Sequence, residues 1–227
     1  MSVAERYQRV LDRVAAAAQR TGRDPAEITL VAVSKTWPAD VLKDAAGAGV
    51  EVFGENRAQE LKEKFAVLGD RVRWHFVGPL QSNKVRAVVG VAELVHSVDR
   101  YGLAEAIARR ARALGVVQDV LIEVNAGGEA TKHGVEPAGA ARLAEEVAAL
   151  DGVAVRGLMA IPPRSDDPEA TRPYFRDLAA LLDLVAGGVP EAVELSMGMS
   201  GDFEQAIEEG ATIVRVGEAI FGPRRTR

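Results

Sequence analysis

The segment that decides the fold is Leu30-Val31-Ala32-Val33-Ser34-Lys35-Thr36. Its first four residues are apolar and partly β-branched, and a short run of this kind predicts a buried strand. Lys35 then stands at the carboxyl end of that strand, where its ammonium group needs an explanation. The simplest explanation is that the side chain extends past the strand end into water. The rest of the sequence favours a different one.

Strand and helix patterns alternate along the whole chain. Predicted strands cover residues 29–34, 51–53, 73–77, 93–96, 119–124, 153–158, 192–195 and 212–216. Predicted helices cover residues 2–21, 39–48, 57–68, 84–89, 101–114, 136–150, 169–185 and 202–209.

Strands that alternate with helices form parallel βαβ units. Eight such units in 227 residues fit an α/β fold of the closed (β/α)8 type, preceded by an extra N-terminal helix. A doubly wound open sheet is the alternative, and the lack of a GxGxxG motif after the first strand argues against it. No low-complexity linker or shift in composition divides the chain, so we predict one domain over residues 1–227.

The composition is that of an ordinary globular protein. A formal net charge of -5 and a hydrophobic fraction of 48% indicate neither a nucleic-acid-binding surface nor a disordered chain. There is no cysteine, which excludes disulfides, thiolate nucleophiles and cysteine metal ligands. No signal peptide and no apolar run of membrane-spanning length is recognisable. We therefore expect a cytoplasmic protein that binds neither nucleic acid nor membranes.

Barrel closure would place two cations at one mouth. The last predicted strand pairs with the first, so Arg215 is expected close to Lys35. Such crowding is unfavourable unless an anion lies between the two groups, or the amine loses its proton and acts as a nucleophile. Barrels of this type commonly bind phosphate at the loops after strands seven and eight, here residues 196–201 and 217–218. Glycines in both loops let backbone N–H groups approach an anion, although similar loops also occur as plain turns and caps.

Six motifs, spread from about residue 29 to residue 222, resemble the pyridoxal phosphate homeostasis protein family. They are VAVSKT at 31–36, FGEN at 53–56, WHFVGPLQSNK at 74–84, GLMAIP at 157–162, LSMGMS at 195–200 and VRVGEAIFG at 214–222. The resemblance implies the fold of the N-terminal barrel of alanine racemase. It also implies that pyridoxal 5'-phosphate (PLP) is held as a Schiff base on the lysine of the first strand.

The same resemblance assigns roles to individual residues. Lys35 corresponds to the lysine that carries the cofactor. Ser200, Gly217 and the neighbouring backbone correspond to the phosphate site, and Arg215 to the residue that faces the pyridine nitrogen. Asn56 and Ser196 are further candidates, as neighbours of the ring.

An arginine at the pyridine nitrogen bears on the activity. Arginine stays protonated and only donates hydrogen bonds, so the ring nitrogen is expected to stay unprotonated and carbanion chemistry is disfavoured. Racemisation also needs acid and base groups on both faces of the substrate carbon. Tyr7, Tyr101 and Tyr174 offer no obvious second base, although Tyr101 is not excluded. We expect a protein that holds and releases PLP with little or no catalysis, and a PLP-dependent amino-acid racemase is the alternative.

Other residues are expected to be structural. We interpret His75, His96 and His133 as hydrogen-bonded histidines too scattered to bind a metal. Trp74 and Phe76 are predicted core residues.

The remaining expectations concern caps, the tail and partners. Glu55 and Asn56 are predicted to cap the second barrel helix, and residues 224–227 to form a solvated end. PLP-dependent apo-enzymes are possible recipients of the cofactor, and we expect a monomer. The sequence leaves the roles of His75, Asn83 and Tyr101 open.

Overall fold

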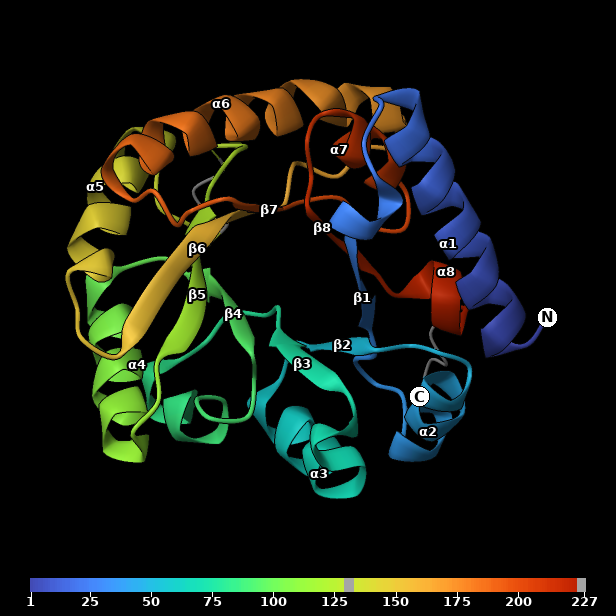
Figure 1. Ribbon diagram of the computed structural model, residues 1–227, viewed down its shortest axis with the longest axis horizontal. Helices are drawn as coiled ribbons and strands as arrows, with labels where there is room; N and C mark the ends of the chain where they lie inside the picture. Colours follow the sequence, from blue (N-terminus) through green and yellow to red (C-terminus); the bar gives the residue numbers. More distant parts are fainter. Residues whose placement is uncertain (129–132, 224–227) are drawn as a thin grey trace.

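The structure is a computed structural model that describes residues 1–128 and 133–223. Eight parallel strands close into a barrel in the order β1 to β8, with the helices outside the ring (Figure 1). The strands are β1 (Thr29–Val33), β2 (Val52–Glu55), β3 (Arg73–Phe76), β4 (Leu94–Val98), β5 (Gln118–Val124), β6 (Val153–Ala160), β7 (Glu194–Ser196) and β8 (Ile213–Val216). The predicted (β/α)8 barrel is therefore confirmed, and the open sheet is excluded.

Helices follow or precede every strand. They are α1 (Val3–Arg20), α2 (Ala39–Gly47), α3 (Ala58–Leu68), α4 (Tyr101–Leu114), α5 (Pro137–Ala148), α6 (Arg172–Gly188), α7 (Phe203–Glu208) and α8 (Glu218–Phe221). Short 3-10 helices lie at η1 (Pro25–Glu27), η2 (Gly69–Arg71), η3 (Ser82–Ala87) and η4 (Pro168–Thr171). The helix expected at 84–89 was wrong, because η3 occupies most of that segment. The tail at 224–227 lies outside the described residues.

The extra helix α1 begins at a capping box. Ser2 Oγ accepts a hydrogen bond from the Glu5 N–H, and the Glu5 carboxylate accepts one from the Ser2 N–H at 2.7 Å, which satisfies two otherwise unpaired donors. The helix packs beside α7 and α8 (Figure 1). Arg6 Nε donates to the carbonyl oxygen of Ile220 at 2.7 Å, so the start of the chain is fastened to the segment that follows β8.

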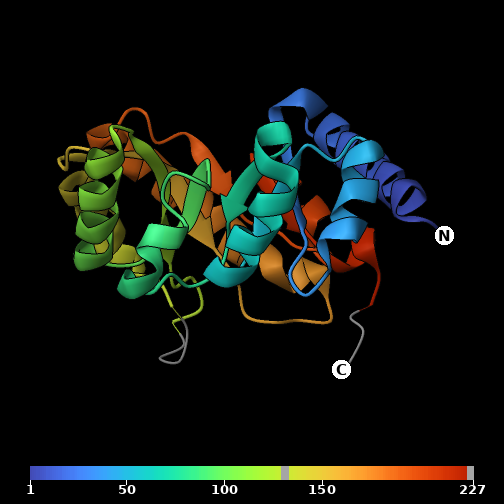
Figure 2. The same ribbon diagram turned by 90° about the horizontal axis from the view of Figure 1, so that it is seen from below.

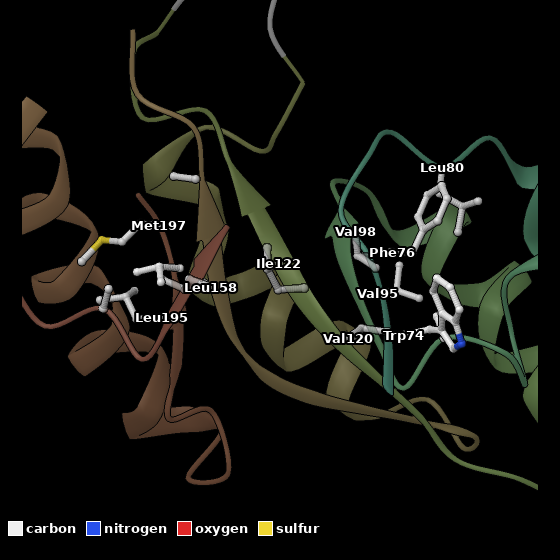
Figure 3. Close-up of a cluster of buried hydrophobic side chains, with 14 of the residues drawn as sticks. Trp74, Phe76, Leu80, Val95, Val98, Val120, Ile122, Leu158, Leu195 and Met197 are labelled. Atoms are coloured by element: carbon white, nitrogen blue, oxygen red, sulfur yellow. The ribbon is translucent and has the colours of Figure 1, made fainter. Parts of the chain in front are cut away.

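The strands alternate between two apolar layers. Trp74, Phe76, Val95 and Ile122 belong to the large buried cluster outside the barrel (Figure 3), which confirms the prediction for the two aromatic residues. A second, smaller cluster fills the lumen and consists of Val31, Val52, Leu94, Leu121, Met159 and Ile213. Because side chains alternate along a strand, the residues two positions beyond these inner residues also face the lumen.

All the strands point the same way, so their carboxyl ends share one mouth. In the side view the loops after β1 and β6 lie on the same side of the molecule (Figure 2). The first strand, β1, pairs with the last strand, β8, and Val31 lies opposite Arg215. Lys35 follows four residues after Val31, in the turn after β1. This pairing places Arg215 on the strand next to β1, whose carboxyl end leads into the turn that carries Lys35.

Gly157 is a position at which the close packing of neighbouring barrel strands can be tested. It sits where the β5–β6 register shifts between Val120 and Leu121, and its φ is +153°. A Cβ atom there would overlap the backbone carbonyl of Glu194 on β7. We predict that Gly157→Ala lowers the free energy of unfolding by about 3 kcal/mol or more, measured by urea denaturation.

Gly187→Ala is the matched control for this prediction. Gly187 lies in α6 with no atom within 4 Å of a built Cβ, so the added methyl should stabilise the helix by about 0.5–1 kcal/mol. Equal effects of the two substitutions would contradict the assigned contact.

Candidate functional site

Arg215 is the centre of a polar site inside the barrel. The side chain comes from the inner face of β8 and is only 4% exposed. Its Nη1 donates to Ser196 Oγ at 2.5 Å, and its Nη2 donates to the carbonyl oxygen of Ala160 at 2.9 Å. Burial lowers the pKa of Arg215 to about 10, while the charges of Glu123 and Asp202 oppose the shift. The guanidinium is thus a fixed, protonated donor at neutral pH, held by strands β6 and β7.

Two histidines extend this polar site across the lumen. His96 Nδ1 lies 2.9 Å from Ser196 Oγ, and His96 Nε2 lies 3.0 Å from His75 Nδ1. Both rings are buried. Burial lowers the pKa of His75 to about 3 and that of His96 well below its usual value, so both rings are neutral and each carries one N–H. A hydrogen-bonded row therefore runs from His75 through His96 and Ser196 to Arg215.

The sequence interpretation of the histidines was half right. His75 and His96 are hydrogen-bonded, as expected, but they are not scattered, because β3 and β4 bring them together. His133 is exposed and its Nδ1 lies 4.0 Å from Asp99 Oδ2. Among the described residues no group of three or more His, Asp or Glu side chains is placed to hold a metal ion.

Glu123 is a site residue that sequence reasoning missed. It lies two residues beyond the inner residue Leu121 on β5 and is 8% exposed. Burial, together with the charge of Asp99, raises the pKa of Glu123 to about 7, although Arg215 acts in the opposite direction. The available signal was a carboxylate near the end of β5, directly after the apolar residues Val120, Leu121 and Ile122. Glu123 is therefore a group that can take or give a proton near neutral pH.

The loops after β7 and β8 adjoin each other. Ser200 Oγ accepts a hydrogen bond from the N–H of Ala219, just after Gly217, at 3.3 Å. A Cβ atom at Gly217 would lie 2.9 Å from the carbonyl oxygen of Val33, so only glycine allows this close approach to β1. The two loops and the end of β1 thus form one continuous surface at the mouth.

Asn56 and Glu55 do not cap a helix, and that prediction was wrong. The N-cap of α3 is Arg57, with no side-chain capping bond. Glu55 instead accepts a hydrogen bond from Lys64 Nζ at 2.6 Å. The Oδ1 atom of Asn56 is buried without a hydrogen-bond partner among the described residues, and Gly78 packs against the Asn56 backbone.

The remaining candidate residues have definite places. Lys35 is half-buried in the turn after β1. Asn83 is exposed in η3, and Tyr101 is 43% exposed as the first residue of α4. The structure therefore brings Ser196 together with Arg215, and Ser200 close to Gly217, on the mouth where Lys35 also lies.

A cavity of about 330 Å³ lies at the opposite end of the barrel. Arg73, Glu93, Asp119 and Arg156 surround it, and His75 reaches it from the lumen. Arg156 pairs with Asp119 at 3.0 Å and Arg73 with Glu93 at 3.6 Å, so both arginines of this wall are paired with carboxylates. In (β/α)8 barrels chemistry is located at the carboxyl ends of the strands, and we assign the functional site to that mouth.

The buried histidines predict a pH dependence of stability. A histidine whose pKa is about 3 when folded and about 6.5 when unfolded binds its proton only in the unfolded chain between those values. Stability is therefore lost as the pH falls from about 6.5 towards 3. We predict that His75→Gln reduces the slope of the free energy of unfolding against pH, between pH 4 and 6, by about 1.4 kcal/mol per pH unit.

Denaturant unfolding at several pH values measures this slope. His133→Gln removes an exposed histidine and should leave the slope of the parent protein. An unchanged slope for His75→Gln would mean that His75 binds its proton in the folded state as well.

Comparison with known proteins identifies the family. The sequence model described as "Alanine racemase, N-terminal domain" matches residues 7–225. The pyridoxal phosphate homeostasis protein of Aquifex aeolicus is 49% identical over 227 residues, which cover 99% of this chain and 100% of the relative. The protein of the same name from Escherichia coli is 41% identical over 226 residues, which cover 98% and 97% of the two chains.

Solved structures agree with these matches. PipY of Synechococcus elongatus, solved with PLP bound, has a TM-score of 0.82 and 35% identity, with 97% of this chain and 100% of PipY covered. Alanine racemase of Corynebacterium glutamicum shares the fold, with a TM-score of 0.72 at 16% identity, and the match covers 96% of this chain and 61% of the racemase. The chain therefore belongs to the alanine racemase N-terminal domain family and, within it, to the pyridoxal phosphate homeostasis proteins.

Proposed function

We propose that this protein binds PLP at the carboxyl-end mouth of the barrel, as a Schiff base on Lys35, and takes part in PLP (vitamin B6) homeostasis. The observation that carries the proposal is the buried guanidinium of Arg215. Arg215 lies on β8, the strand that pairs with β1, and its Nη1 donates a hydrogen bond to Ser196 Oγ. The full-length match to pyridoxal phosphate homeostasis proteins and to PipY, solved with PLP bound, supports it.

The residues at the mouth fit such a group. The buried, unpartnered Oδ1 of Asn56 is an acceptor that the described protein does not satisfy, and buried acceptors normally have partners. Gly217 lies so close to Val33 that no side chain fits there, so the loop where a phosphate would bind has no side chain at this position. In this proposal Ser200 and Gly217 hold the phosphate, and Asn56 and Ser196 lie beside the ring.

Bound PLP supplies an aldehyde that condenses with an amine and a ring that can accept electrons. Lys35 would supply the amine for that condensation, which releases one water. Arg215 only donates hydrogen bonds, so it would hold the ring nitrogen unprotonated and leave the ring a weak electron acceptor. The arrangement suits holding and releasing the cofactor better than catalysis on it.

An amino-acid racemase is the second candidate, and Glu123 is the observation that favours it. Its carboxyl group faces the lumen and has a pKa of about 7, so it is able to act as an acid or a base at physiological pH. Tyr7, buried in α1, and Tyr174, in α6, lie on the helical layer and do not serve this role.

The biological setting is also part of the proposal. We propose that one barrel domain over residues 1–227 carries the function, as a cytoplasmic monomer that passes PLP to PLP-dependent apo-enzymes. The described part of the chain contains no helix long and apolar enough to cross a membrane.

The spectrum of the protein tests the cofactor proposal. We predict that the parent protein mixed with PLP develops a Schiff-base absorption band, and that Lys35→Ala loses it because no amine remains at that position. Lys62→Ala, on the exposed face of α3, should keep the band. A band that persists in Lys35→Ala would disprove the assignment of the lysine.

Chiral chromatography separates the two functions. The loaded protein would be incubated with each L-amino acid, and turnover above about 1 s⁻¹, the low end for enzymes, would favour a racemase. In that case Glu123→Gln should abolish turnover while the absorption band stays. Transfer of PLP to an apo-enzyme, without turnover, is the result expected for a homeostasis protein.

A further inference from the structure

The turn that carries Lys35 has an unusual backbone. Thr36 has a φ of +70° and is the one non-glycine residue with positive φ among the residues that the structure describes. A threonine pays a steric cost in this region, and such strain persists only where surrounding contacts impose it. The contacts that impose it here come from α3.

One buried ammonium group holds both sides of Lys35. Lys64 Nζ donates to the carbonyl oxygen of Ser34 at 2.8 Å, to Glu55 Oε1 at 2.6 Å and to Glu60 Oε2 at 3.1 Å. All three donors of the ammonium are thereby used. The side chain of Lys64 is only 6% exposed.

The carboxylates of Glu55 and Glu60 connect the Lys64 ammonium to the turn that carries Lys35. Glu55 Oε1 also accepts from the hydroxyl of Ser34 at 2.6 Å, and Glu60 Oε2 also accepts from the N–H of Thr36 at 2.8 Å. The residues directly before and after Lys35 are therefore tied to the same cation. The direction in which the Lys35 side chain leaves the backbone is fixed as a result.

Burial of this charged cluster costs free energy of folding. Glu55 is fully buried and its Oε2 has no hydrogen-bond partner among the described residues. Burial raises the pKa of Glu55, and the neighbouring Lys64 charge opposes that rise. Buried ion pairs often contribute little to stability, because the cost of desolvation offsets their attraction. A role in holding the turn explains the cluster better than a role in stability.

We propose that Lys64 is a positioning residue for Lys35, and that Glu55 and Glu60 transmit its effect to Ser34 and Thr36. The inference rests on the proposed function, in which the Lys35 amine must meet the aldehyde of PLP. A lysine side chain has many rotamers, so a fixed backbone direction raises the fraction of time the amine spends in a reactive position.

The test uses two variants and a matched control. Lys64→Met removes the ammonium and keeps the chain length, and Glu55→Gln/Lys64→Met also removes the buried carboxylate that would otherwise lose its partner. Lys62→Met changes an exposed lysine of the same helix. We expect the melting temperature to fall in the single variant and to recover at least partly in the double variant, because the isolated charge is gone.

Two rates then report on Lys35. The first is the rate of Schiff-base formation after mixing with PLP, which we expect to fall about 10- to 100-fold in both Lys64 variants and to stay unchanged in Lys62→Met. The second is the labelling of Lys35 by a small acetylating reagent in cofactor-free protein, measured by peptide mass spectrometry. In both Lys64 variants the rate of Lys35 labelling should approach the labelling rate of the exposed Lys43. In Lys62→Met the rate of Lys35 labelling should equal that of the parent protein.

The outcomes separate the claims. If the folded double variant keeps the parent values of both rates, Lys64 has no positioning role and the inference is overturned. If the parent protein forms no Schiff base, the proposed function fails, and the labelling of cofactor-free protein still decides the role of Lys64. Recovery of the parent rates in Lys64→Arg would support a positioning role exerted through the positive charge.

Discussion

The pairing of the first strand with the last is the constraint on which the rest of the structure depends. Val31 on β1 lies opposite Arg215 on β8, and this register can form only if all eight strands close into a ring. Closure sets which residues share the mouth. It brings the turn with Lys35 beside the loops with Ser200 and Gly217, although these segments are far apart in the chain.

The lumen of this barrel is only partly apolar, and its polar part serves the site. Six inner residues form a small apolar cluster, whereas Arg215, Ser196, His96 and His75 form a hydrogen-bonded row. Buried polar groups are tolerated when they satisfy one another. The row fixes the guanidinium, which stays protonated at neutral pH because its pKa of about 10 lies well above it.

Most of the fold was predictable from sequence because apolar periodicity reports burial directly. The strand around Leu30–Val33 and the outward aromatic residues Trp74 and Phe76 follow from it. The segment after β3 was misassigned because Val85 and Val88 are both buried at a spacing of three, which the tighter 3-10 turn accommodates as well as an α-helix does.

The site was less predictable, because its contacts join residues distant in sequence. The contact between His75 and His96 depends on the pairing of β3 with β4, and the buried bond between Glu55 and Lys64 spans a strand and a helix. Glu123 required an inward orientation that is visible only once the strand parity is known. The family motifs named Lys35, Arg215, Ser196, Ser200, Gly217 and Asn56, but they did not reveal the groups that support them.

Hydride trapping tests the central claim most directly. The parent protein would be incubated with PLP, reduced with borohydride, digested and mapped by mass spectrometry. We predict that the pyridoxyl group is found on Lys35 in near-stoichiometric amount, and that the buried Lys64 and the exposed Lys84 remain unmodified. Modification spread over several lysines, or concentrated on a lysine other than Lys35, would contradict the account.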